Sequence, residues 1–313
     1  MLFDNEKILI TGSSGLIGSN LLKRLKKNGD KVIGIDSKND LRNADNALSV
    51  IGEFKPTIVF HLAAKVGGIY ANNNFKADFY SDNVLINTNL VNACVKSKVD
   101  YIFAMGTGCA YPKRLENKIL FEKDFLDGIP EITNDAYAYA KRGLLVHLKS
   151  LEESKVLNYT YCIPANIYGP YDNFHPLNSH VVPGLIRRFY DCKNKKIDEI
   201  SIWGDGSAQR DFLYIDDCID AIIKLSQLKF CGSINISSGK LTSIKELSEK
   251  ISSEINFKGR IKYDNTKLTG QKQRIMDSSK MTKIGWVPKT NLSNGIKKTV
   301  SWFIENRSSI REK

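Results

Sequence analysis

The start of the chain constrains the fold more than any other stretch, because an apolar strand, a glycine-rich turn and an amphipathic helix follow one another directly. Residues 7–10, Lys-Ile-Leu-Ile, predict a short buried strand, and the helical pattern that begins at Leu16 stops at Asn28-Gly29. Between them, residues 11–18 read Thr-Gly-Ser-Ser-Gly-Leu-Ile-Gly. Glycines at this spacing let the backbone turn tightly and approach a pyrophosphate at the helix N-terminus. We therefore expect this turn to bind a dinucleotide through Gly12, Ser14, Gly15, Leu16, Ile17 and Gly18.

Strands and helices alternate through the first half of the chain. Apolar runs predict further strands at 31–35, 57–64, 101–105 and 159–163. Helical periodicity is present at 82–95 and 135–153. This alternation is typical of an α/β fold with a doubly wound parallel sheet of the Rossmann type, which binds ligands at the carboxyl ends of its strands. We expect a cofactor-binding domain at 1–166, rejoined by about 214–240, and a smaller mixed α/β substrate-binding domain at 167–213 and 241–313.

A tyrosine and a lysine four residues apart are the candidate proton-transfer pair. On a helix over 135–153, Tyr137 and Lys141 share one face, and a fixed ammonium would lower the pKa of the phenol from its usual value of about 10. Such a phenol suits proton donation to a carbonyl that receives a hydride. The stretch Gly106-Thr107-Gly108-Cys109 leaves the predicted strand 101–105 at its carboxyl end, where a catalytic loop is expected.

The residues after the second predicted strand are divided between the two nicotinamide cofactors. Asp36 lies about 20 residues past the glycines, and an acid there usually binds the adenosine ribose hydroxyls of NAD. Ser37 and Lys38 come next, and both can hold the 2′-phosphate of NADP. We expect His61 to be a hydrogen-bonded core residue. The strand that contains it ends in residues across which a cofactor can lie, namely Leu62, Ala63 and Ala64.

Composition argues against several classes of protein. Of 313 residues, 42% are hydrophobic and 26% are charged, which is ordinary for a globular chain. The net charge of +12 favours anionic partners, but no arginine-rich run interleaved with aromatic residues indicates nucleic-acid binding. Six cysteines without a C-x-x-C pair argue against a zinc site and a disulfide framework, so no metal is expected. Without a signal peptide or an apolar run of about 18 residues, we expect a cytoplasmic protein with no membrane span.

Over essentially its whole length the chain resembles the extended short-chain dehydrogenase/reductase family. The glycine turn, the Tyr137/Lys141 pair and the run 210–217 occur in that family's order and spacing. Within it, the chain is similar to the GDP-L-fucose synthases, NADPH-dependent 3,5-epimerase/4-reductases of GDP-4-keto-6-deoxymannose. That similarity lies in the runs 61–69, 109–113 and 172–180. The resemblance implies an NADP(H)-dependent oxidoreductase that acts on a GDP-4-keto sugar.

The resemblance also implies catalytic roles for individual residues. Thr107 stands where the family has its catalytic Ser or Thr, and it would bond the sugar C4 oxygen beside Tyr137. Lys141 would bind the nicotinamide ribose and hold the pKa of the tyrosine down. Cys109 and His180 match the base and the acid of the epimerisation, because a C4 ketone acidifies the hydrogens at C3 and C5. A thiolate near the cationic Lys141 is a competent base.

Binding residues follow from the same resemblance. Ser37-Lys38 with Asp40-Leu41 is similar to the family's adenosine-phosphate region, which favours NADP(H) over NAD(H). Further cofactor contacts are implied for Pro164, Asn166 and Ile167. Arginine suits a pyrophosphate, and contacts with the nucleotide sugar are implied for Asn166, His180, Arg188, Trp203, Arg210 and Asp277. A homodimer is implied as well, through a four-helix bundle of the helix near 82–95 and the Tyr137 helix.

Several positions depart from the family pattern. Thr107-Gly108-Cys109 replaces Ser-Ser-Cys, Arg142-Gly143 replaces an apolar small pair, and Tyr139 is bulkier than the usual residue. Asp36 is unusual for an NADP enzyme. These changes leave open whether the sugar is a 6-deoxyhexose or a heptose and whether epimerisation is retained, since one pocket change alters discrimination by about 1–3 kcal/mol. The alternatives are a 4-reductase without epimerisation, an epimerase with tightly bound NAD, and a non-catalytic NAD(P)-binding regulator.

Overall fold

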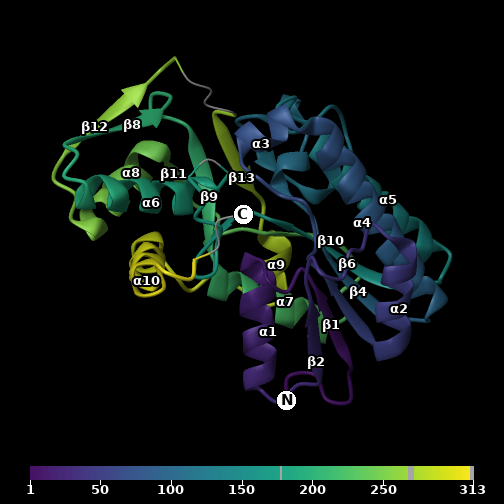
Figure 1. Cartoon of the computed structure of the whole chain (residues 1–313). Helices are drawn as coiled ribbons and strands as arrows, with labels where there is room; N and C mark the ends of the chain where they lie inside the picture. Colours follow the sequence, from purple (N-terminus) through teal and green to yellow (C-terminus); the bar gives the residue numbers. More distant parts are fainter. Residues whose placement is uncertain (177, 267–270, 311–313) are drawn as a thin grey trace.

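A parallel sheet forms the centre of the N-terminal half of the computed structural model, which describes residues 1–313 except 177, 267–270 and 311–313 (Figure 1). Six described strands pair in the order β2-β1-β3-β4-β6-β10. They are β1 (Ile8–Thr11), β2 (Val32–Ile35), β3 (Ile58–His61), β4 (Tyr101–Met105), β6 (Asn158–Pro164) and β10 (Gly232–Ile236). The predicted doubly wound parallel sheet is confirmed. The strand order reverses between β1 and β3, which is where such sheets bind ligands.

Helices cover both faces of this sheet (Figure 1). Side chains alternate between the faces: Ile8 and Phe103 pack in one core cluster, while Leu9 and Ile102 pack in the other. The first cluster includes buried residues of α1 (Leu16–Lys27) and α7 (Ile215–Gln227). The second includes residues of α2 (Ala44–Phe54), α4 (Lys76–Lys96) and α5 (Asp135–Glu153). Burial on both faces explains why the strands read as continuous apolar runs rather than alternating ones.

The remaining elements form a mixed region and several connections. β9 (Gln209–Tyr214) pairs in parallel with β7 (Asn166–Tyr168) and β13 (Gln273–Met276), and antiparallel with β11 (Leu241–Ser243). β13 also pairs with β5 (Ile119–Leu120), and β8 (Glu199–Trp203) pairs with β12 (Arg260–Asp264). The helices here are α6 (Val181–Asn194), α8 (Ile244–Ile255), α9 (Ser279–Lys283) and α10 (Leu292–Glu305). Short connections contain α3 (Ile69–Asn74), η1 (Gly108–Ala110), η2 (Lys113–Leu115) and η3 (Glu122–Asp124).

The predicted mixed α/β character of the C-terminal part is confirmed, and β10 returns to the first sheet beside β6. The residue limits given above for the two domains stay a prediction. Leu177, within the run 172–180, lies outside the described residues. Within the described ranges, no helix combines the length and the apolar character needed to cross a membrane.

Candidate active site

The glycine turn between β1 and α1 leaves no room for a side chain at two of its positions. Gly12 has φ +68°, and a Cβ there would lie 2.8 Å from the backbone nitrogen of Ala63. A Cβ on Gly18 would overlap the carbonyl oxygen of Gly12 and lie 2.8 Å from Cα of Ser13. Gly15 precedes α1 without a side-chain cap. The turn therefore has the bare backbone and helix N-terminus that a pyrophosphate requires.

The end of β3 is tied to this turn by Thr11. Its Oγ1 accepts hydrogen bonds from the amides of Leu62 and Ala63, both at 3.1 Å. These two amides bond a side chain instead of a neighbouring strand, and β3 ends at His61 rather than at Ala64 as predicted. The predicted cofactor residues 62–64 thus lie beside Gly12, at the point where the strand order reverses.

His61 is a buried core residue, as predicted, and it links the sheet to two helices. Its Nδ1 lies 3.2 Å from the Thr11 hydroxyl oxygen and its Nε2 lies 2.9 Å from Oδ1 of Asn87. Since the amide oxygen of Asn87 can only accept, Nε2 carries the ring proton and the Thr11 hydroxyl donates to Nδ1. Asn87 donates in turn to the carbonyl of Ala140, at 3.3 Å, on α5. Burial lowers the pKa of His61 to about 3, aided by the charge of Lys141.

The residues after β2 form an exposed polar turn. The Asp36 carboxylate accepts a hydrogen bond from the Lys38 amide at 2.9 Å, while the side chains of Ser37 and Lys38 face solvent. Asp40 pairs with Arg42, whose Nη2 lies 2.8 Å from Oδ2, and this pairing lowers the pKa of the Asp40 carboxyl. Leu41 is buried beneath them. Arg42, which was not among the predicted site residues, also lies 3.3 Å from Oδ1 of Asp82 on α4.

Tyr137 and Lys141 lie on α5 as predicted, but their electrostatics differ from the prediction. Nζ of Lys141 donates to the carbonyl of Met105 at 2.8 Å, and it lies 5.9 Å from the centroid of the Tyr137 ring. Burial lowers the pKa of Lys141 to about 8. Burial also raises the pKa of Tyr137 well above its usual value, and the charge of Cys109 adds to this rise. The expectation that Lys141 depresses the pKa of Tyr137 is therefore wrong for this structure, because burial dominates.

Cys109 lies in η1, on the loop after β4, and an arginine far away in the sequence contacts it. Nη1 of Arg274 lies 3.0 Å from Sγ of Cys109, and Nη2 lies 3.2 Å from Oδ1 of Asn166. Thr107 accepts a hydrogen bond from the Cys109 amide at 3.3 Å. Burial raises the pKa of the Cys109 thiol, but Arg274, Thr107 and Arg210 together outweigh it, and the net pKa is lowered. The prediction that Lys141 activates this thiol is therefore wrong, because the cation that contributes most to lowering its pKa is Arg274.

Arg142, one of the departures from the family pattern, supports the same loop. Its Nε donates to the carbonyl of Ala110 at 2.8 Å and its Nη1 donates to the carbonyl of Gly128 at 2.6 Å. The guanidinium also lies 5.8 Å from the centroid of the Tyr139 ring. Arg142 is buried. It therefore fixes the residue that follows Cys109, a function that the sequence alone did not indicate.

The end of β6 adjoins the catalytic loop. Pro164 is the last residue of β6, and Asn166 and Ile167 begin β7. A Cβ on Gly108 would lie 3.1 Å from the carbonyl oxygen of Pro164. These predicted cofactor contacts thus lie at the same sheet edge as Thr107.

The structure disperses the other predicted substrate residues over the C-terminal half. Arg188, on α6, donates to the carbonyl of Ser201, and burial lowers its pKa. Trp203, at the end of β8, is 49% exposed. Asp277 follows β13 and accepts hydrogen bonds from Ser279. His180 immediately precedes α6 and is exposed. Among the described residues, no hydrogen bond joins these four to Cys109 or Tyr137.

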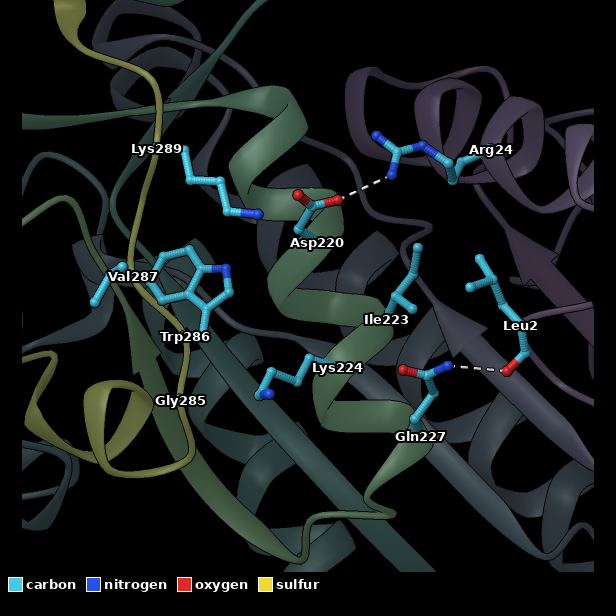
Figure 2. Close-up of a pocket in the computed structure, with 10 residues that line it drawn as sticks. All are labelled: Leu2, Arg24, Asp220, Ile223, Lys224, Gln227, Gly285, Trp286, Val287 and Lys289. Carbon is cyan, nitrogen blue, oxygen red and sulfur yellow. Dashed lines mark hydrogen bonds and ion pairs between the residues drawn. The ribbon is translucent and has the colours of Figure 1, made fainter.

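A surface hollow of about 360 Å³ lies elsewhere, between α1, α7 and the chain after α9 (Figure 2). Arg24 and Asp220 form an ion pair across it at 2.9 Å, and Gln227 donates to the carbonyl of Leu2 at 3.0 Å. Arg24 is in the last turn of α1, so the hollow adjoins the end of that helix opposite the glycine turn. None of the ten labelled lining residues is a predicted site residue, and we assign it no part in the chemistry.

Comparison with known families agrees with this geometry. The model of the NAD dependent epimerase/dehydratase family matches residues 8–236, from β1 to the end of β10. The chain belongs to this family. The resemblance to extended short-chain dehydrogenases/reductases is thereby confirmed.

Individual members of the epimerase/dehydratase family align along nearly the whole chain. GDP-L-fucose synthase 1 from Arabidopsis thaliana is 37% identical over 308 residues, covering 96% of this chain and 94% of that protein. The structure of a GDP-L-fucose synthetase from Naegleria fowleri bound to NADP has a TM-score of 0.87 and 31% identity, covering 99% of this chain and 96% of that one. A GDP-mannoheptose C4 reductase from Campylobacter jejuni with NADP bound has a TM-score of 0.86 and 27% identity, covering 96% and 98%.

Proposed function

We propose that the chain is an NADPH-dependent 4-keto reductase of a GDP-4-keto sugar that also epimerises the sugar at C3 or C5. The observation that supports this proposal is the closeness of Cys109, on the loop after β4 with Thr107, to Tyr137 on α5. The charge of Cys109 acts on Tyr137, which means that a proton donor and a candidate carbon base lie close to each other. The relatives named above, which act on GDP-sugars, support the same substrate class.

The residues present fit a dinucleotide cofactor. Side chains at Gly12 and Gly18 would collide with backbone atoms, so the turn is kept open to a pyrophosphate. Ser37 and Lys38 are exposed, where they would hold an adenosine 2′-phosphate. Asp36 is engaged by the Lys38 amide, which lessens the negative charge facing such a phosphate. Bound NADPH would supply the hydride for C4 of the sugar.

Tyr137 would give its proton to the C4 oxygen as that oxygen becomes an alkoxide. A phenol with a raised pKa keeps its proton at neutral pH, and it therefore starts the reaction in the donor form. Thr107 would bond the same oxygen. Lys141, held by the Met105 carbonyl, would bind the nicotinamide ribose. When its amine is protonated, it would also place a positive charge at the carboxyl end of β4.

Cys109 and His180 would carry out the epimerisation before reduction. The Cys109 thiolate takes a proton from the carbon next to the ketone, which leaves an enolate whose charge lies on the C4 oxygen. His180 then gives a proton to the opposite face of that carbon. Arg210, with its pKa lowered to about 10 by burial and by Arg274, would pair with the GDP pyrophosphate. Arg188, Trp203, Asn166 and Asp277 would complete the nucleotide-sugar contacts.

The test is turnover of a panel of GDP-4-keto hexoses and heptoses with NADPH and NADH in deuterated water, with products identified by NMR. We expect NADPH oxidation and deuterium at C3 or C5. Tyr137→Phe should lower kcat at least about 100-fold, the usual contribution of a general acid. Unchanged turnover in Tyr137→Phe would favour a non-catalytic role. Reduction without deuterium would leave the 4-reductase alternative in place.

The chain is also proposed to be a homodimer in the cytoplasm. α4 and α5 pack against each other and leave apolar side chains 45–50% exposed, namely Tyr80, Leu85, Tyr139 and Val146. An apolar surface on two adjacent helices suits a four-helix bundle with a second copy. All six cysteines are free thiols, which suits a reducing compartment.

A further inference from the structure

Arg274 occupies a position that joins three segments of the chain. It lies on β13, opposite Arg210 of β9 in the parallel register, while the next residues of β13 pair with β5. Its two terminal nitrogens are divided between Sγ of Cys109, at 3.0 Å, and Oδ1 of Asn166, at 3.2 Å. A guanidinium held by two partners in this way has a fixed plane, which a lysine ammonium would not have.

We propose that Arg274 is a positioning residue that holds the Cys109 sulfur as a thiolate, fixed beside Tyr137, ready to take a proton from the sugar. The inference rests on the proposed function only for the use of that thiolate. It deepens that function, because neither the glycine turn nor the Tyr137/Lys141 pair accounts for an ionised thiol.

The groups that face Cys109 favour Arg274 over any other cation. Thr107 is on the same loop, Tyr137 is a neutral phenol on α5, and Arg210 is on β9. Arg210 acts on the sulfur through its charge, whereas its Nη1 donates to the carbonyl of Gln209 at 2.8 Å. Among the described residues, Arg274 supplies the guanidinium hydrogen bond to the sulfur.

The two arginines also explain why the pKa of the thiol is lowered although the site is partly buried. Arg210 and Arg274 are adjacent in register, and the charge of Arg274 helps to lower the pKa of Arg210 to about 10. A negative sulfur that acts on both guanidinium groups reduces their mutual repulsion. The ionised state of Cys109 therefore stabilises the charged state of both arginines, and the ionisation states of the three side chains are coupled.

The experiment measures the ionisation of Cys109 directly, without substrate. The full chain is alkylated with iodoacetamide from pH 5 to pH 10, and the peptide that contains Cys109 is quantified by mass spectrometry, with Cys109→Ser to identify its signal. In the wild type we expect an apparent pKa below the usual thiol value of about 8.5. A wild-type value at or above that figure overturns the inference without any variant.

Three substitutions separate charge from structure. Arg274→Met removes the charge and keeps the length, and we expect alkylation at pH 7 to slow about tenfold, equal to a pKa rise of about one unit. Arg274→Lys should restore most of the rate, because the charge returns. Arg260→Met, at an exposed ion pair with Glu199, is the matched control and should change nothing. Equal alkylation rates in Arg274→Met and wild type contradict the inference.

A second readout keeps the inference distinct from the proposed function. Arg274→Met should slow deuterium entry at C3 or C5 about tenfold, and it should slow the reduction of an already epimerised sugar by less than about twofold, since thiolate formation serves only the first step. A wild type that takes up no deuterium refutes the proposed epimerisation and leaves the alkylation result to decide the role of Arg274. Equal slowing of both steps contradicts a role through the thiolate.

Discussion

Acidification should destabilise the protein through His61. Its ring is fully buried, and its pKa is about 3 in the folded protein against 6.5 as the ordinary value. Between these two values the unfolded chain binds a proton that the folded chain does not. Stability from this group is therefore complete above pH 6.5 and is lost as the pH falls toward 3.

The size of this effect follows from the shift. A shift of about 3.5 units at about 1.36 kcal/mol per unit gives about 5 kcal/mol over the whole range, and about 2 kcal/mol between pH 7 and pH 5. Burial explains most of the shift, and the charge of Lys141 adds to it, because both disfavour a second proton, on Nδ1, that would make the ring cationic. The same proton would disturb the path through Asn87 to Ala140, the residue before Lys141.

The assay is urea unfolding of the wild type and of His61→Gln at pH 7, 6 and 5. At pH 7 the variant should be less stable, because it disrupts a buried hydrogen-bond network. The difference in unfolding free energy between the two proteins should then shrink by about 2 kcal/mol by pH 5. His147→Gln is the control: burial lowers the pKa of that partly buried ring as well, so a smaller change of the same sign is expected. A difference that stays constant with pH would refute the reasoning.

Three further predictions concern the cofactor turn, the catalytic loop and the dimer. Gly18→Ala should weaken NADPH binding at least about tenfold, since its Cβ collides with backbone and overpacking costs about 1–3 kcal/mol. Gly52→Ala in α2, where a Cβ meets nothing within 4 Å, should instead stabilise the protein by about 0.5–1 kcal/mol. Calorimetry measures NADPH binding for the first variant and thermal unfolding for the second. Arg142→Met should lower the unfolding free energy by about 2 kcal/mol in urea, because the buried carbonyl of Ala110 and the partly buried carbonyl of Gly128 lose a charged donor. Unaltered stability would show that water replaces the donor. Val146→Glu should convert the dimer to a monomer in light scattering, whereas Ile304→Glu, at a similarly exposed apolar position on α10, should not; a monomeric wild type would remove the dimer proposal.

The sequence predicted the sheet and the Tyr137 helix well because their signals are local. The apolar run 101–105 and the helical pattern 135–153 coincide with β4 and α5 at both ends. The boundary of β3 was wrong because a side chain, Thr11, takes the amides that a longer strand would use. A helix can also extend beyond the stretch whose apolar residues are periodic, and α4 begins at Lys76 rather than near Asp82.

The electrostatics of the site were not predictable from spacing. A shared helix face for Tyr137 and Lys141 does not state where the ammonium is directed, and the Met105 carbonyl decides that. Arg274 lies 165 positions from Cys109, in a short strand whose partners are also distant in sequence. Nothing in the stretch around it is periodic enough to place its side chain. Its function required the strand register.

The pairing of β13 sets a limit on how this enzyme can change. Successive side chains of a strand point in opposite directions, so moving β13 along its partners by one residue would bring Gln273 or Ile275 to the place of Arg274. The sulfur would then face an amide or a hydrocarbon. Insertions before β13 are therefore tolerated only if they keep this register. A deletion of one residue within β13 would remove the guanidinium from the Cys109 sulfur, although every catalytic residue would still be present in the sequence.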